Sequence, residues 1–166
     1  MGPAGPAGLG QGDLVTITVW TVSTHHAAFR CGGWASVRLV AGEPSGVAGG
    51  ERATTAARMA LAGLIAGLRD LPPGADATVQ TVGAQLMALP GVLGGQIRPE
   101  EDLDLWAQVL TAAKGRTLTL SRAIAAPDSP LAFAGAWADL AMDKAKSGGA
   151  FASAIPKGNL TKALGR

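Results

Sequence analysis

The feature that most constrains the fold of this 166-residue chain is a change in hydrophobic period near Thr54. Before it, β-branched and apolar residues alternate over 15–21 and again over 32–42, a pattern typical of strands. After it, apolar residues recur at positions i, i+3, i+4 and i+7, which is one face of a helix. These residues are Leu61, Leu64, Ile65 and Leu68. A chain that changes period in this way is expected to pack helices on a sheet.

The rest of the chain continues this order of strands and helices. A glycine-rich third strand is predicted over 44–53, and Thr54 or Thr55 is suited to cap the helix that Pro72 ends. Further strands are predicted over 76–82 and 116–124, and helices over 84–89, 99–115 and 129–148. We therefore predict an α/β domain over 13–147, in which three antiparallel strands precede alternating helices and strands and a five-stranded mixed sheet is flanked by helices.

Charge is distributed unevenly along the chain. All twelve acidic residues precede residue 144, whereas five of the fourteen basic residues lie at or after it. Those five are Lys144, Lys146, Lys157, Lys162 and Arg166. We predict a flexible leader over 1–12 and a basic flexible tail over 148–166. In the alternative, the tail folds back and covers apolar surface with Phe151 and Ile155.

Composition narrows the class of protein. No apolar run reaches the roughly 18 residues of a membrane span, and the start lacks the regions of a signal peptide, so a cytoplasmic location without a membrane partner is expected. Cys31 is the single cysteine, which excludes an intramolecular disulfide and a multi-cysteine zinc site. The abundance of glycine and alanine is typical of a GC-rich bacterial gene.

Three motifs carry a resemblance to a known family. They are "GGWASVRLV" at 32–40, "SGVAGGERATTAARMAL" at 45–61 and "DLDLWAQVLTAA" at 102–113. They resemble type 1 of the ribonuclease H family, in which a Gly-Gly-Trp/Tyr strand precedes a Thr-Thr-Asn-Asn-Arg-Met-Glu-Leu helix start and, later, an Asp-Leu-Trp helix. The resemblance covers about residues 14–146 and implies the ribonuclease H-like fold. Shared motif residues are Gly32, Gly33, Trp34, Thr54, Thr55, Arg58, Met59, Leu61, Asp104, Leu105 and Trp106.

That family cuts the RNA strand of RNA–DNA hybrids with two metal ions, which about four carboxylates hold. Carried over residue by residue, the four carboxylate positions fall on Val22, Ala60, Val82 and Ala138. The two asparagines that contact the nucleic acid fall on Ala56 and Ala57, and the basic handle of many members is shortened to "PGVLGGQIRPE". Because Mg²⁺ and Mn²⁺ prefer oxygen ligands, the resemblance implies a degenerate member with no metal, no cofactor and no nuclease activity.

Three functions remain open from the sequence. The first is a pseudoenzyme that acts as an interaction module and binds an unknown protein at its apolar former cleft. The second is a non-cleaving nucleic-acid binder with weak, non-specific affinity, whose contacts are Arg30, Arg58 and the five basic residues from Lys144 onward. The third is an active nuclease with a rearranged site of Asp13, Glu51 and Asp139.

Other residues are interpreted more simply. His25 and His26 are expected in a surface loop near Cys31, with a metal contact or a pH-sensitive contact as the alternative. Trp106 and Trp137 are expected in the core. A stripe of small residues on the first helix indicates close packing or, in the alternative, a groove for a partner helix. The stripe comprises Ala56, Ala60, Gly63 and Gly67.

Overall fold

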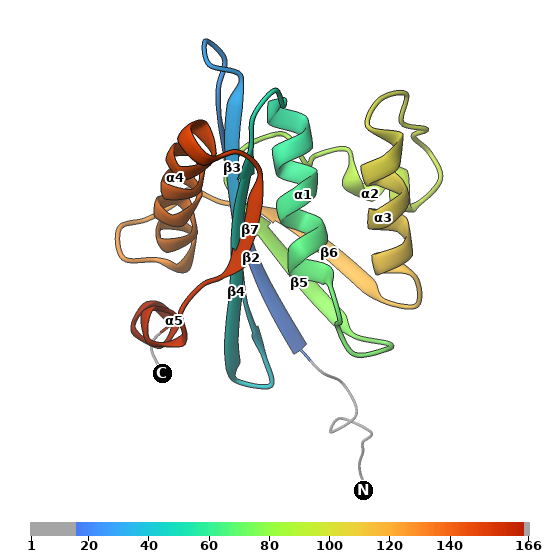
Figure 1. Cartoon of the computed structure of the whole chain (residues 1–166). Coiled ribbons are helices and arrows are strands. Elements are labelled where there is room, and N and C mark those ends of the chain that lie inside the picture. The colour runs from blue at the N-terminus through green and yellow to red at the C-terminus, as the bar shows by residue number, and fades with distance from the viewer. Residues whose placement is uncertain (1–15, 165–166) are drawn as a thin grey trace, which may run out of the picture.

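The computed structural model describes residues 16–164 and shows a mixed sheet with helices on both faces (Figure 1). The strands are β2 (Thr16–His26), β3 (Cys31–Val40), β4 (Glu43–Glu51), β5 (Asp76–Thr81), β6 (Thr117–Arg122) and β7 (Phe151–Ala154). The helices are α1 (Ala56–Leu68), α2 (Leu89–Leu93), α3 (Leu103–Ala113), α4 (Pro130–Gly148) and α5 (Lys157–Leu164). The predicted leader, Asp13 and Arg166 lie outside the described residues.

The sheet has the strand order β6-β5-β2-β3-β4-β7. The strands β2, β3 and β4 pair antiparallel, whereas β5 pairs parallel with β2 and β6 pairs parallel with β5. This confirms the predicted α/β mixed sheet, in which three antiparallel strands precede alternating helices and strands. The sheet has six strands rather than five, because β7 adds to the edge of β4.

The C-terminal segment is folded, which corrects the prediction of a flexible tail over 148–166. Ile155, Leu160 and Leu164 are buried beside Ala48 of β4 in one core cluster. Lys157 Nζ donates to Glu43 Oε1 at 2.9 Å. Burial of apolar side chains, rather than the positive charge of the segment, determines its conformation. This agrees with the alternative prediction, in which Phe151 and Ile155 cover apolar surface.

Each face of the sheet has its own core. The helices α1 and α3 cover one face, and α4 covers the other (Figure 1). Glycines let the helices approach closely: a Cβ on Gly63 of α1 would lie 2.7 Å from Thr21 Oγ1, and one on Gly67 would collide with Ser36 Oγ. The small-residue stripe of α1 therefore packs against the sheet.

Two helix boundaries differ from those predicted. Helix α2 spans Leu89–Leu93 rather than 84–89, because Pro90 occupies the first turn, where it is tolerated, instead of ending the helix. Helix α3 begins at Leu103, so Glu100 and Glu101 precede it. No helix among residues 16–164 is both long enough and apolar enough to cross a membrane.

The folded C-terminal segment generates a stability prediction. Leu160→Ala should lower the free energy of unfolding by about 2–3 kcal/mol, because it leaves a cavity beside β4. Urea unfolding of the full chain measures this, and Lys162→Ala, at an exposed position on the same helix, should change little. Equal stability of Leu160→Ala and the unsubstituted protein would contradict the packing of α5.

Candidate functional site

A hollow of about 370 Å³ lies at the edge of the sheet where β2 and β5 end, and Val22, Ala60 and Val82 all line it. Because β2 and β5 are parallel neighbours, their C-terminal ends meet at this edge. The first turns of α1 border the same hollow through Ala56 and Ala60. Three positions that the sequence comparison grouped are therefore together in space.

Ala138, the fourth position, does not line the hollow among the described residues. It is fully buried on α4 against Gly33 of β3, where a Cβ would collide with the Ala138 carbonyl oxygen. Gly135 of α4 approaches Val22, since a Cβ there would lie 3.7 Å from Val22 Cγ1, and Val22 also packs against the core cluster that contains Ala138. No described residue of α4 lines the hollow itself.

The side chains that line the hollow do not provide the ligands that a pair of divalent cations requires. None of the described residues that line it carries a carboxyl group, and its polar side chains are Ser23, Thr24, His25, Thr81 and Gln85. Mg²⁺ and Mn²⁺ prefer carboxylate oxygens, which also offset the charge of the ions. Hydroxyl and amide groups supply no such charge.

Of the alternative rearranged site, Asp13 lies outside the described residues, and Glu51 and Asp139 belong to different elements. Glu51 ends β4 opposite Gly32, and Asp139 is exposed on α4. No group of three or more His, Cys, Asp or Glu side chains suited to a metal ion occurs among residues 16–164.

His25 and His26 belong to the end of β2 and not to a loop, which corrects the sequence prediction. They pair with Gly32 and Cys31 of β3. His25 Nε2 lies 3.0 Å from the carbonyl oxygen of Thr54, and because a carbonyl only accepts, Nε2 carries the proton and donates. His26 instead contacts the ring of Phe29, with ring centroids 4.8 Å apart. The two imidazoles therefore have separate structural contacts.

Arg58, predicted as a nucleic-acid contact, is engaged in an ion-pair network. Its guanidinium donates to Asp104 through two bonds of 3.1 and 2.9 Å and to Asp102 Oδ1 at 3.1 Å. The hydrogen bonds with Asp104 and then Asp102 raise the pKa of Arg58, and those from Arg58 lower the pKa of Asp104. The network joins the start of α1 to the start of α3. Sequence reasoning missed it because the partners are 44 and 46 residues away from Arg58.

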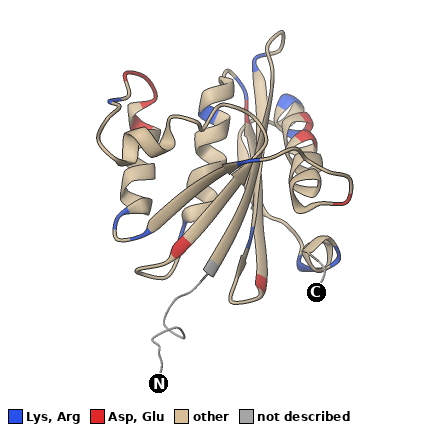
Figure 2. Cartoon of the chain, turned by 180° about the vertical axis from the view of Figure 1, so that it is seen from behind, with Lys and Arg blue, Asp and Glu red and all other residues tan. Residues whose placement is uncertain are grey.

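The remaining basic candidates form two separate groups. Lys146 Nζ lies 3.8 Å from the centroid of Phe29, the neighbour of Arg30 in the β2–β3 turn, and Lys144 Nζ lies 4.6 Å from that of Phe151. Lys157 and Lys162 are on α5, away from that turn (Figure 2). The structure therefore places Arg30, Lys144 and Lys146 at one end of the molecule.

Arg52, which the sequence did not single out, joins β4 to α4. Its guanidinium donates to the carbonyl oxygens of Ala145, Lys146 and Ser147 at 3.1–3.3 Å. These groups belong to the last turn of α4, where carbonyls are left without a complete set of helical partners and favour a cation; Ala145 also accepts from the Gly149 N–H. Arg52 therefore stabilises the helix end that carries Lys144 and Lys146.

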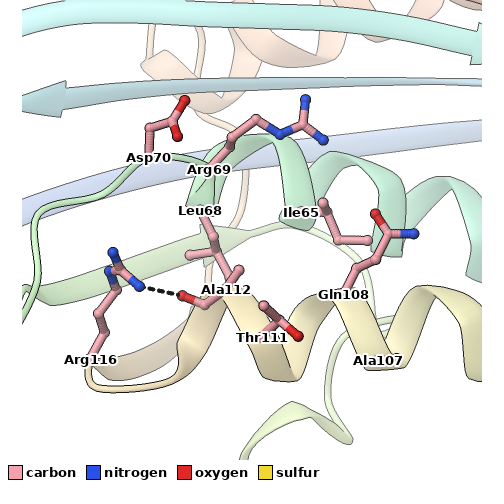
Figure 3. Close-up of a pocket in the computed structure, with 9 residues that line it drawn as sticks. All are labelled: Ile65, Leu68, Arg69, Asp70, Ala107, Gln108, Thr111, Ala112 and Arg116. Atoms are coloured by element: carbon pink, nitrogen blue, oxygen red, sulfur yellow. Dashed lines mark hydrogen bonds between the residues drawn. The ribbon is translucent and has the colours of Figure 1, made fainter.

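A second hollow, of about 390 Å³, lies between the end of α1 and α3 (Figure 3). Its Arg116 donates to the carbonyl oxygens of Pro72 and Ala112, each at 3.1 Å, and also to Leu71. Arg69 and Asp70 extend from the end of α1 away from the α3 side chains. Because the guanidinium of Arg116 is engaged by the backbone, we interpret this hollow as a packing seam.

Comparisons with known proteins identify the fold. No protein-family model matches the sequence, and no curated protein matches it. The solved structures similar to this chain include two ribonuclease H structures. This chain has the ribonuclease H-like fold. LC9-RNase H1, described as a type 1 ribonuclease H with the type 2 active-site motif, superposes with a TM-score of 0.61 and 18% identity over 84% of this chain and 78% of its own.

The second similar structure is the N-terminal ribonuclease H domain of Rv2228c from Mycobacterium tuberculosis, solved as a fusion with maltose-binding protein. Its TM-score is 0.57 at 20% identity, over 79% of this chain and 96% of that chain. These likenesses confirm the ribonuclease H-like fold that the motifs indicated.

The ion pairs of Arg58 generate a prediction on pH. The pKa of Asp104 in the folded state lies below its ordinary value of 3.8, so the stabilisation is complete above that value and is lost as the pH falls through the folded-state pKa. Asp104→Asn should therefore be less stable than the unsubstituted protein near neutral pH, and the difference should disappear in acid.

Urea unfolding across this pH range measures that difference. Asp143→Asn is the matched control, since Asp143 is exposed on α4 and forms no ion pair within residues 16–164. A difference between Asp104→Asn and the unsubstituted protein that does not change with pH would contradict the coupling to Arg58.

Proposed function

We propose that this protein is a ribonuclease H-like domain without nuclease activity, which acts as an interaction module through the hollow at the ends of β2 and β5. The observation that supports it most is the convergence of Val22, Ala60 and Val82 in one hollow whose described lining has no carboxyl group. A two-metal reaction needs acidic ligands around both ions. Aliphatic side chains supply none.

The chemistry of the hollow favours a protein segment as its occupant. Its lining combines aliphatic and small side chains with hydroxyl, amide and imidazole groups, a combination suited to a partner's apolar side chain and nearby backbone groups. A nucleic-acid backbone would need cations, and none of the described lining residues is Lys or Arg. Arg58, close by on α1, is already paired with Asp102 and Asp104. We place the protein in the cytoplasm, consistent with its single, unpaired and buried cysteine.

The second candidate function is non-cleaving nucleic-acid binding. The observation that favours it is that Lys146 lies over the exposed ring of Phe29, beside Arg30, while Lys144 of the same helix lies over Phe151. Cations beside an aromatic ring can contact phosphates and stack on a base. Such binding would be weak and sensitive to salt, and it would leave the hollow free.

The proposal predicts both an inactive protein and a way to restore a metal site. The unsubstituted protein should leave the RNA strand of an RNA–DNA hybrid intact with Mg²⁺ or Mn²⁺. The triple variant Val22→Asp, Ala60→Glu, Val82→Asp should gain a Mn²⁺ site, because its three carboxylates would meet in one hollow. Titration calorimetry with Mn²⁺ measures the gain, and circular dichroism verifies folding.

The matched control carries three acidic substitutions at exposed positions, Leu103→Asp, Leu110→Asp and Ile124→Asp. It adds equal charge without a common site and should not gain Mn²⁺ affinity. Metal-dependent cleavage by the purified, unsubstituted protein would contradict the proposal, above all if Asp139→Asn or Glu51→Gln abolished it.

A further inference from the structure

Helix α3 has apolar residues on two sides, one buried against the core and one exposed to solvent. Val109 and Ala113 are its buried residues, whereas Leu103 is 59% and Leu110 45% exposed. Leu103, the half-buried Trp106 and Leu110 have the spacing i, i+3, i+7, which places them along one side of the helix. A surface helix in a protein with no partner there is expected to carry polar residues on this side.

The exposed apolar side of α3 continues into a hollow of about 410 Å³ between α2 and α3. Ala88, Val92, Ile97 and Trp106 supply its apolar lining. Ile97 is held over Gly91, whose carbonyl oxygen accepts the Gln96 and Ile97 N–H groups at 2.9 and 3.0 Å. With Met87 beside Ala88, four of the seven large exposed hydrophobic residues lie on this side. They are Met87, Ile97, Leu103 and Leu110. We call this surface the α2–α3 groove.

The rim of the α2–α3 groove is acidic. Glu100, Glu101 and Asp102 line it, with Arg98 as the one cation among the described lining residues. Asp102 is held by Arg58, but neither Glu100 nor Glu101 forms an ion pair within residues 16–164. Figure 2 shows acidic residues gathered on the segment that leads into α3. An anionic ligand such as nucleic acid would be repelled at this rim.

We propose that the α2–α3 groove docks a basic amphipathic helix of a partner protein. The partner's apolar residues would cover Leu103, Trp106 and Leu110 and enter the hollow, while its Lys or Arg side chains would face Glu100 and Glu101. Helix-in-groove recognition uses anchors at helical spacing, and the carboxylates on the rim provide charge complementarity. This surface is separate from the hollow of the proposed function, and either can fail without the other.

The probe is a fluorescein-labelled helical peptide of leucine and lysine, with leucines on one face, measured by fluorescence anisotropy on the full chain. A peptide with glutamate in place of lysine is the control for charge. The unsubstituted protein should bind the lysine peptide saturably and more weakly as salt rises. Leu103→Ser with Leu110→Ser should weaken binding by about tenfold or more, and so should Glu100→Lys with Glu101→Lys.

The matched control variant makes the same kinds of change on another face, with Leu140→Ser, Asp139→Lys and Asp143→Lys on α4, where all three residues are exposed. It should bind the lysine peptide as the unsubstituted protein does. An equal loss in this control, saturable binding of the glutamate peptide, or no saturable binding of the lysine peptide would overturn the proposal. A dimer in light scattering that Leu103→Ser abolishes would also overturn it, because a second copy would then cover the groove.

Discussion

The parallel pairing of β2 with β5 is the constraint on which the rest of the structure depends. It places the ends of the two strands at one edge, and α1, which connects β4 to β5, must cross the face of the sheet to reach β5. That crossing buries the apolar side of α1, and Gly63 and Gly67 let its backbone approach the strands. The hollow lined by Val22, Ala60 and Val82 is a direct geometric consequence of this pairing.

Charge in this protein is located around the hollow rather than in it. Arg58 forms ion pairs with Asp102 and Asp104 beside α1, and Arg52 donates to the carbonyl groups at the end of α4. The unpaired carboxylates of Glu100 and Glu101 lie on the α2–α3 side, and Lys144 and Lys146 lie near the β2–β3 turn. A neutral hollow between charged surfaces is arranged differently from a site for metal ions and phosphates, which needs both signs of charge at the reacting atoms.

Hydrophobic period predicted much of this fold, because β2 and α1 each bury a face that recurs regularly along the sequence. Two predictions that rested on residue type were wrong. Proline is compatible with either end of a helix, and Pro90 lies in the first turn of α2 rather than ending a helix. The basic residues after 143 suggested a solvated tail, but that segment packs against the core. Three other features depend on contacts between residues that are distant in sequence, so the hydrophobic period could not predict them. Short strand β7 forms only because β4 offers an edge, the partners of Arg58 are remote in sequence, and Ala138 is buried in the core under α4 rather than lining the hollow.

The central claim is that this ribonuclease H-like edge has lost the ability to hold divalent cations. Anomalous diffraction from crystals soaked in Mn²⁺ tests it most directly, because it locates the metal without requiring activity. The account predicts no anomalous peak in the hollow between Val22, Ala60 and Val82. One or two peaks there, about 4 Å apart if paired, would contradict it and would show that ligands other than carboxylates at these positions hold the ions.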